Sequence, residues 1–319
     1  MSFSAYPRPP AWRGNDVFTY SAHFQEPLEN VLKAIASGRL PSESDDKLRR
    51  ELHRELELGS GVLFHDSRLL RNLEADPFRD IFRAFCLWLG FPVSINQQGD
   101  YLKEVRDHGL RDSNNAPQRG HLTRQELTFH SDRADLTVLG CWSPAAKGGE
   151  FRIRSSVDIV AQIEQRQPDW LPYLYKPIAH DLRNEGDRPW FLLPLLSENE
   201  HLFVMRYIRK FNDSVIRHGV QQPPDVRQML TEIDEIIEQP GHFAEIHLRK
   251  GMLIAVNNHT TLHARTQFEN DEHFERCLLR CWLSSEFTRP LPDSFQPLFH
   301  STTAGALRGG VRPDKRMTT

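Results

Sequence analysis

A histidine and an aspartate lie two residues apart in the segment Phe129-His130-Ser131-Asp132. Side chains two residues apart point the same way along a strand, so His130 and Asp132 share a face if this segment is extended. About 130 residues downstream, the stretch from Asn257 to Arg265 contains a third candidate ligand, His263. Two histidines and one carboxylate form a facial triad, which leaves open positions on a non-haem Fe(II) for other ligands. A chain with such a site must fold so that two distant segments meet.

The residues around this pair strengthen the interpretation. The chain has 15 histidines, so a histidine and an aspartate at this spacing also occur by chance on a surface. Leu127 and Phe129 before the pair and residues 136–139 after it place the pair at the edge of an apolar strand. His259 lies four residues before His263, but no glutamate stands beside it, so the helical zinc motif of metalloproteases is absent. We therefore expect His263 to be the third ligand.

Hydrophobic periodicity predicts a few helices among many short strands. Helices are expected within residues 27–58, where Ser44 and Asp45 are cap candidates, and over residues 76–90, 155–165 and 225–238. Strands are expected over residues 61–65, 92–96, 136–142, 151–154, 245–248, 252–256 and 276–283. Arg249-Lys250-Gly251 is predicted to join two of them as a tight hairpin. Residues 107–119 form a polar loop without periodicity, and loops of that length are usually functional or disordered.

The short strands come at irregular intervals and do not alternate regularly with helices. This pattern argues against a doubly wound sheet and favours the α+β class with a mainly β core, arranged as a double-stranded β-helix (jelly roll) wrapped by helices. We expect residues 1–16 to form an N-terminal arm that packs through Tyr6 and Trp12 or stays mobile. Residues 17–301 are expected to form a single domain with a helical N-terminal part, and residues 302–319 a flexible tail.

Composition limits the partners of the chain. Its 40 Lys and Arg residues against 43 Asp and Glu residues give a formal net charge of −3, which is too balanced for electrostatic binding of nucleic acid or an anionic membrane. There is no signal-like start, and no apolar run approaches the roughly 18 residues of a membrane span, so we expect a cytoplasmic protein. The four cysteines lack disulfide or zinc spacing and are expected to be buried thiols. Composition leaves homo-oligomerisation open.

Two arginines recur at strand spacing in the segment Arg276-Cys277-Leu278-Leu279-Arg280-Cys281-Trp282-Leu283. A period of two places Arg276 and Arg280 on one face and Leu279 with both cysteines on the other. Arginines that face inward from an apolar strand need anions, and the planar guanidinium matches a carboxylate at two points. One arginine would hold the distal carboxylate of 2-oxoglutarate and the other a carboxylate or sulfonate of the substrate. The alternative is an exposed strand face with solvated arginines.

Together these segments resemble one known family. Glu126 to Asp132, Gly148-Gly149, Asn257-Asn258, His263 to Thr266, Phe268 to Asn270 and Arg276 to Leu283 follow the order seen in Fe(II)/2-oxoglutarate-dependent oxygenases of the taurine dioxygenase and clavaminate synthase-like group. The resemblance covers roughly residues 56–283. It implies that His130, Asp132 and His263 are the iron ligands. It also implies that Arg276 binds the distal carboxylate of 2-oxoglutarate and that Arg280 contacts the substrate.

One position departs from the pattern of that family. Similar taurine dioxygenase-like enzymes have a glycine doublet, then an acidic residue and then a threonine, and this threonine helps to hold the cosubstrate. This chain has Phe151 at the position of the threonine. The resemblance therefore leaves the second anchor of 2-oxoglutarate unassigned. Asp132 follows the pattern, whereas family members that halogenate have a small residue there, so hydroxylation or desaturation is implied.

The resemblance implies a jelly-roll dioxygenase that uses Fe(II), 2-oxoglutarate and O2 and releases succinate and CO2. Its substrate would be a small molecule with a carboxylate or sulfonate, such as an amino acid or a natural-product intermediate. Glu126, four residues before His130, is a candidate for binding a substrate amine or hydroxyl, or else a solvated carboxylate at a strand edge. Two alternatives remain open: a metal-binding jelly roll without oxygenase activity, and a zinc hydrolase that uses the same triad with an activated water. A pair of inward arginines argues against the hydrolase.

Overall fold

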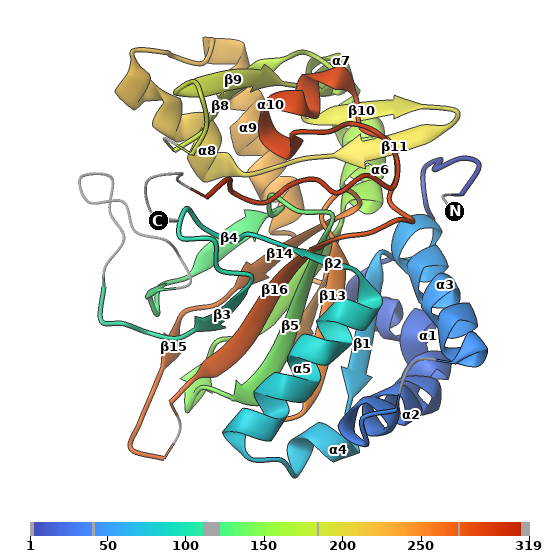
Figure 1. Cartoon of the computed structure of the whole chain (residues 1–319). Coiled ribbons are helices and arrows are strands. Elements are labelled where there is room, and N and C mark those ends of the chain that lie inside the picture. Colours follow the sequence, from blue (N-terminus) through green and yellow to red (C-terminus); the bar gives the residue numbers. More distant parts are fainter. Residues whose placement is uncertain (1–2, 40–41, 111–121, 184, 274, 314–319) are drawn as a thin grey trace.

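Antiparallel sheets form the centre of the protein, and helices cover them (Figure 1). The computed structural model describes residues 3–39, 42–110, 122–183, 185–273 and 275–313. In this part of the chain one sheet has six strands, in the order β1 (Val62–Asp66), β13 (Met252–Asn257), β5 (Leu136–Ser143), β16 (Cys277–Ser284) and β2 (Phe91–Val93), with β3 (Leu102–Val105) also paired to β16. A second sheet has four strands, in the order β12 (Phe243–Ile246), β7 (Phe151–Ser155), β14 (Thr261–Arg265) and β4 (Leu127–His130).

The other elements are small sheets and helices. Two-stranded sheets pair β10 (Leu196–Asn199) with β11 (Leu202–Met205), β15 (Phe268–Glu269) with β6 (Lys147–Gly148), and β8 (Ile178–Asp181) with β9 (Trp190–Leu193). The α-helices are α1 (Val17–Ser21), α2 (Gln25–Ala36), α3 (Glu43–Leu58), α4 (Arg68–Arg71), α5 (Ala75–Leu89), α6 (Ser156–Arg166), α7 (Leu171–Leu174), α8 (Arg209–Asp213), α9 (Pro224–Ile237) and α10 (Gln296–Phe299). Short 3-10 helices are η1 (Gly14–Asp16), η2 (Ala22–Phe24), η4 (Pro168–Trp170), η5 (Ser214–His218) and η6 (Asp293–Phe295).

A hydrophobic core fills the space between the two large sheets. Leu139 and Leu278 point into it from the six-stranded sheet, and Phe151 and Ile153 point into it from the four-stranded sheet. Successive side chains of a strand alternate between faces, so Leu279 lies on the outer face of the six-stranded sheet. Each sheet therefore has two buried faces, and only one of them borders the space between the sheets.

Helices bury the outer face of each sheet. On the six-stranded sheet, Val138 and Leu279 pack against apolar side chains of α2, α3 and α5, among them Phe82. On the four-stranded sheet, Leu262 and neighbouring residues pack against α6 and α9, whose Met229 is fully buried. In Figure 1, α5 lies across the strands β5 and β16, and α6 and α9 lie toward the opposite end of the molecule. This arrangement confirms the α+β class with a mainly β core.

The helix predicted within residues 27–58 is two helices. The N-cap of the second, α3, is Ser42, two residues before the expected cap Ser44 and three before Asp45. The Ser42 side chain accepts from the backbone N–H of Asp45, and the Asp45 carboxylate accepts from the backbone N–H of Ser42, which forms a capping box. Asp45 is therefore a capping residue at the third helical position, and Ser44 lies inside the first turn.

The predicted hairpin at Arg249-Lys250-Gly251 is wrong. A turn is present, with the Met252 N–H donating to the Arg249 carbonyl at 3.1 Å and Gly251 at a φ of 96°. However, β12 pairs with β7, whereas β13 pairs with β1 and β5, so the turn crosses from one sheet to the other. β12 alternates between buried and half-buried residues, whereas every residue of β13 is buried. Both strands point one face at the core between the sheets, and periodicity alone does not distinguish a crossing from a hairpin.

The two ends of the described chain pack on the core. Tyr6 and Trp12 of the N-terminal arm are both buried, and the Tyr6 hydroxyl donates to the Phe287 carbonyl at 2.7 Å. In the C-terminal segment, Arg308, Gly310 and Val311 are buried, whereas Leu307 and Arg312 are exposed, and residues 314–319 lie outside the described residues. The Arg308 side chain is fully buried and forms an ion pair with Asp135 at 2.8 Å. The flexible tail over residues 302–319 stays a prediction.

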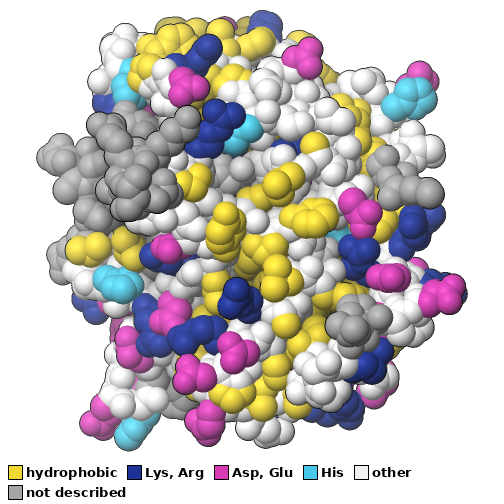
Figure 2. Space-filling model, viewed as in Figure 1, with side chains coloured by type: hydrophobic (Ala, Val, Ile, Leu, Met, Phe, Trp, Pro, Cys, Tyr) yellow, Lys and Arg dark blue, Asp and Glu magenta, His cyan; other side chains and the backbone are white. Residues whose placement is uncertain are grey.

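The face of the molecule in Figure 2 carries basic and acidic side chains interspersed with one another. This mixture agrees with the near-zero net charge of the sequence. None of the helices in the described ranges is both long enough and apolar enough to span a bilayer.

The buried pair of Asp135 and Arg308 predicts a large loss of stability on mutation. Asp135→Asn leaves the Arg308 guanidinium buried without a countercharge, so we expect the free energy of unfolding to fall by about 3–5 kcal/mol in urea titrations followed by circular dichroism. Glu26→Gln is the control, because its ion pair with Arg68 is about two-thirds exposed. That change should cost less than about 1 kcal/mol. Similar losses in both variants would contradict the role assigned to burial.

Candidate metal centre

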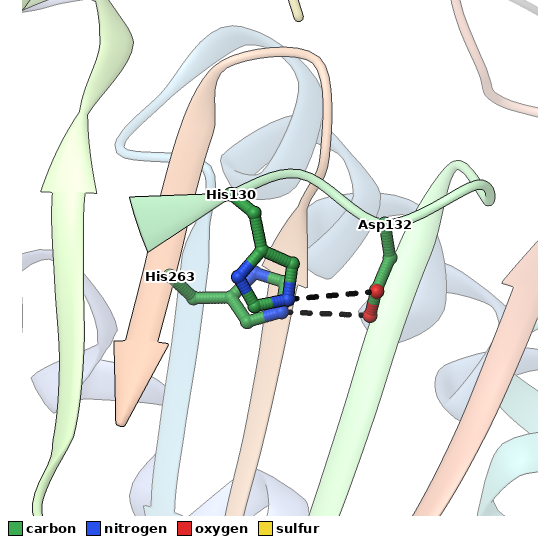
Figure 3. A group of neighbouring side chains, drawn as sticks. All are labelled: His130, Asp132 and His263. Carbon is green, nitrogen blue, oxygen red and sulfur yellow. Dashed lines mark ion pairs between the residues drawn. The ribbon is translucent and has the colours of Figure 1, made fainter. Parts of the chain in front are cut away.

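Cross-strand pairing brings two of the predicted ligands together. In the four-stranded sheet, His263 of β14 lies opposite His130, the last residue of β4. Paired residues point to the same side of a sheet, and the two imidazole centroids are 4.4 Å apart. His263 also packs 5.7 Å from the ring of Phe151, which belongs to the core between the sheets. Both histidines therefore face this interior space (Figure 3).

Asp132 reaches the same place from beyond the strand. β4 ends at His130, so the alternation expected along one strand does not position the carboxylate. Instead, the Ser131 N–H donates to the Tyr207 carbonyl and the Asp132 N–H donates to Asn258 Oδ1, each at 2.9 Å. These bonds hold the loop so that Asp132 points at the two histidines (Figure 3).

The three side chains converge on one point. Asp132 Oδ1 is 3.8 Å from His130 Nε2, and Asp132 Oδ2 is 3.4 Å from His263 Nε2. One ligand atom from each residue lies within 4.8 Å of the other two. Because imidazole nitrogen and carboxylate oxygen bind divalent metal ions at about 2.0–2.2 Å, these separations fit three ligands of a single ion.

Burial and hydrogen bonds favour the metal-binding forms of His130 and Asp132. Burial, with a further contribution from His263, lowers the pKa of His130 to about 4. The His130 Nδ1–H donates to the Thr128 carbonyl at 2.8 Å, so Nε2 keeps its lone pair. Burial acts to raise the pKa of Asp132, but its hydrogen bond and charge interaction with His263 hold that pKa well below its usual value. Neutral imidazole and an ionised carboxylate are what metal binding requires.

A second set of residues orients the Asp132 carboxylate. Trp282 Nε1 of β16 and the Thr137 hydroxyl of β5 each donate to Asp132 Oδ2 at 2.8 Å. Thr137 and Trp282 are neighbours because the two strands pair at these residues. Asn258 supports Thr137 in turn, donating from Nδ2 to the hydroxyl at 3.0 Å. With Oδ2 engaged twice, Oδ1 is the oxygen left for a metal, which favours a single metal–carboxylate bond and an open coordination sphere.

Sequence reasoning missed these supporting residues. Thr137 and Trp282 lie inside apolar strands. The sequence of such a strand does not indicate which residue accepts a hydrogen bond from a polar side chain within it. Asn258 was part of the family-like pattern but had no role assigned to it. A buried Trp and Thr on neighbouring strands become informative only once the strand register is known.

The structure places His259 away from the triad. His259 Nε2 lies 2.8 Å from Asp135 Oδ1, and the ring is buried beside the ion pair of Asp135 with Arg308. Burial lowers the pKa of His259 to about 4, so it is neutral at neutral pH. This location agrees with the choice of His263 over His259 as the third ligand.

Arg276 is buried and forms no ion pair with a carboxylate of the described residues. It precedes β16, is 2% exposed, and its guanidinium lies 5.0 Å from the ring of Phe268. Its Nη1 is buried and has no hydrogen-bond partner among the described residues. Burial lowers the pKa of Arg276 to about 10, which still leaves it charged at neutral pH. A buried guanidinium with an unused donor is the feature expected of an anion-binding residue.

Arg280 lies closer to the triad. It pairs with Leu139 of β5 and is half-buried, with its guanidinium 5.2 Å from the ring of Trp282. Its positive charge is one of the influences that lower the pKa values of both His130 and Asp132. The prediction that Arg280 faces the interior near the site is therefore consistent with its position.

Glu126 is not brought to the triad. His263 and Arg265 are two positions apart on β14, whereas their partners His130 and Leu127 are three positions apart on β4. The strand β4 therefore contains one extra residue at this point. This irregularity puts Leu127 on the same side as His130 and the adjacent Glu126 on the opposite side. Glu126 is exposed and raises the pKa of Glu238, just after α9 on the outer face of the sheet. The exposed position fits the second alternative given for Glu126, a solvated carboxylate at a strand edge.

Comparison with known proteins identifies the family. The family described as "Taurine catabolism dioxygenase TauD, TfdA family" matches residues 25–282. The chain belongs to this family. It is a non-haem iron dioxygenase, and the predicted use of iron, 2-oxoglutarate and O2 is confirmed at the level of the family. The triad His130, Asp132 and His263 provides the donor set that such an iron requires.

Individual relatives agree with membership of the TauD/TfdA family. FR-33289 synthase of Streptomyces rubellomurinus (strain ATCC 31215) is 28% identical over 283 residues, which cover 86% of this chain and 82% of that protein. A structure of asparagine oxygenase with Fe(II), 3-hydroxyasparagine and succinate has a TM-score of 0.60 and 15% identity, covering 80% of this chain and 83% of its own. The non-haem iron oxygenase OrfP with Fe and α-ketoglutaric acid has a TM-score of 0.55 and 16% identity, covering 86% and 93%. The fold is shared with these oxygenases.

The hydrogen bond from Trp282 predicts an effect on metal affinity. Trp282→Phe keeps an aromatic ring but removes the donor to Asp132 Oδ2. Loss of such a supporting bond typically weakens metal binding about 10- to 100-fold, and we expect this range for anaerobic Fe(II) titration. Trp88→Phe is the matched control, because Trp88 Nε1 is buried without a hydrogen-bond partner among the described residues. Equal Fe(II) affinity in the Trp282 variant and the parent would show that this bond does not orient Asp132.

Proposed function

We propose that this dioxygenase hydroxylates or desaturates a small, carboxylate- or sulfonate-bearing substrate, such as an amino acid or a natural-product intermediate. His130, Asp132 and His263 hold the iron, and Arg276 holds the distal carboxylate of 2-oxoglutarate. Arg280 binds the negative group of the substrate. The observation that carries the proposal is the convergence of the three ligand atoms within 4.8 Å at the edge of a space between two sheets.

The two large sheets have the role of the two halves of a jelly roll in this proposal. The four-stranded sheet supplies both histidines, and the six-stranded sheet supplies the residues that orient Asp132. We take residues 17–301 as one domain around this site. When bound, iron would activate O2, which is the oxidant, and 2-oxoglutarate would supply two electrons as it is converted to succinate and CO2. The protein holds the cosubstrate, positions one C–H bond of the substrate and excludes water from the space between the sheets.

Arg276 is proposed to bind the cosubstrate because it is the more deeply buried of the two predicted arginines. Its guanidinium borders Gly149, where an added Cβ would lie 3.1 Å from Arg276 Nε, so the glycine leaves room for the side chain. It also borders a cavity of about 150 Å³, lined by Gly148, Gly149 and Glu150 among others. A planar guanidinium in such a place binds a carboxylate through two parallel hydrogen bonds.

Arg280 is proposed to bind the substrate because its charge acts on two of the metal ligands. A substrate carboxylate or sulfonate at Arg280 would bring the rest of a small molecule close to the metal. Two structurally similar oxygenases were solved with hydroxylated amino acids, 3-hydroxyasparagine and (3S)-hydroxy-L-arginine. Both compounds carry a carboxylate, as the proposal requires of the substrate here.

A hydrolase or a metal-binding protein without oxygenase activity is less well supported. A zinc hydrolase needs the triad and a water, but it has no use for a buried arginine that lacks a carboxylate partner in the described chain. Membership of the TauD/TfdA family also favours an oxygenase. Both alternatives predict that 2-oxoglutarate leaves bound iron undisturbed.

An anaerobic titration tests the proposal. Adding 2-oxoglutarate to the Fe(II)-loaded protein should produce a visible charge-transfer band, and the true substrate should shift it when small amino acids and sulfonates are screened. His263→Ala should lose the band because one ligand is gone, whereas His201→Ala, at an exposed histidine, should keep it. A parent protein that binds Fe(II) but gives no band with 2-oxoglutarate would contradict the assigned function.

The two predicted arginines should fail in different ways. Arg276→Gln loses at least one charge-assisted hydrogen bond worth about 1.5–3 kcal/mol, so the concentration of 2-oxoglutarate needed should rise by at least about 10- to 150-fold. Arg280→Gln should leave 2-oxoglutarate binding near normal but form succinate with little oxidised product, because the target C–H bond is misplaced. Measuring succinate and product together separates the two effects. A substrate that is neutral or cationic, with turnover indifferent to Arg280, would contradict the assignment of that residue.

A further inference from the structure

A third arginine lies in the space between the sheets, and no role has been assigned to it. Arg265 follows His263 by two residues on β14, so both side chains share one face of the strand. Arg265 is 4% exposed and lies directly opposite Phe151 of β7 in the strand register. Phe151 offers no hydrogen-bonding group, so this pair places a buried cation beside an apolar ring.

Part of the Arg265 guanidinium is held by the protein and part is unused. Its Nη2 donates to the carbonyl of Thr123 at 2.8 Å and also to the carbonyl of Gln125. These bonds fix the orientation of the planar group. Its Nε and Nη1 are buried and have no hydrogen-bond partner among the described residues. A side chain held on one edge with free donors on the other is preorganised for a ligand.

Arg265 and Arg276 gather at one aromatic ring. Their guanidinium carbons lie 4.9 Å and 5.0 Å from the centroid of Phe268. Neither arginine forms an ion pair with a described residue, and Asp107 acts on Arg265 only at longer range. Two buried like charges with unused donors are costly, because each is desolvated and the two repel each other. An anion that both arginines contact would remove both costs.

We propose that Arg265 is a second anchor for the distal carboxylate of 2-oxoglutarate, acting together with Arg276. This inference rests on the proposed function, in which Arg276 already binds that carboxylate. Arg265 lies directly opposite Phe151 in the strand pair. The Phe151 side chain has no hydrogen-bond donor for the carboxylate, and the neighbouring Arg265 would supply one. One carboxylate has two oxygens and accepts from both guanidiniums.

The same arrangement ties the cosubstrate to the metal site. Arg265 shares β14 with His263, and its Nη2 binds the carbonyls just before β4, the strand that ends at His130. Arg265 therefore bridges the two strands that carry the histidines. Its primary role is nevertheless ligand binding, and the two roles make different predictions.

The test compares two keto acids on the anaerobic Mn(II)-loaded protein, by calorimetry. 2-Oxoglutarate carries the distal carboxylate, whereas 2-oxovalerate has the same keto acid and ends in a methyl group. Arg265→Gln should weaken 2-oxoglutarate about tenfold, as expected from loss of one charge-assisted hydrogen bond, and leave 2-oxovalerate and Mn(II) binding unchanged. Arg265→Lys, which keeps the charge and is the more conservative change, should weaken 2-oxoglutarate less than Arg265→Gln and also spare 2-oxovalerate.

Each other outcome overturns this inference or the function beneath it. If the variants weaken both keto acids equally, or weaken Mn(II) binding, Arg265 only supports the strands. If neither keto acid is affected, Arg265 does not contact the cosubstrate. If Arg265→Gln does not fold, the Lys variant decides between these outcomes by the same ratio of affinities. If the parent protein does not prefer 2-oxoglutarate over 2-oxovalerate, the proposed function itself fails, and Arg265 is not at issue.

Discussion

The pairing of β4 with β14 is the constraint on which the site depends. It sets His130 opposite His263, although 133 positions separate them in the chain, and no local interaction could do so. The extra residue in β4 is part of the same constraint, because it fixes which side chains of that strand face the interior. Burial under α6 and α9 holds the register, since a one-residue slip would move every apolar side chain of β14 to the wrong face.

The six-stranded sheet supplies the residues that orient the third ligand, Asp132. Asp132 leaves the four-stranded sheet, and its carboxylate is then oriented by Thr137 and Trp282 of the six-stranded sheet. The position of the Asp132 carboxylate relative to the two histidines therefore depends on the distance between the two sheets. The apolar core between the sheets sets that distance. Buried charge has a similar role elsewhere: Asp135 and Arg308 fasten the C-terminal segment beside the loop that carries Asp132.

The sequence was sufficient for features that depend on local pattern or on chemistry that few residues share. The helices α5, α6 and α9 were predicted with small errors at their ends. The sequence also singled out His130, Asp132 and His263, which the fold brings together, and their role as iron ligands stays a prediction. Features set by register were not predictable: the sheet crossing after β12, the irregularity that turns Glu126 outward, and the partners of Thr137 and Trp282. The burial of Arg308 against Asp135 was likewise beyond the sequence, because composition does not show which arginine of a Gly- and Arg-rich segment meets a buried acid.

The central claim is that one iron ion binds His130, Asp132 and His263 beside the arginines of the interior. Anomalous diffraction at the iron edge, from crystals grown anaerobically with Fe(II) and 2-oxoglutarate, tests it most directly. We expect one strong peak bonded to His130 Nε2, Asp132 Oδ1 and His263 Nε2, with the cosubstrate extending from the metal to Arg276. Iron bound at other residues, or a 2-oxoglutarate whose distal carboxylate points away from Arg276, would contradict it.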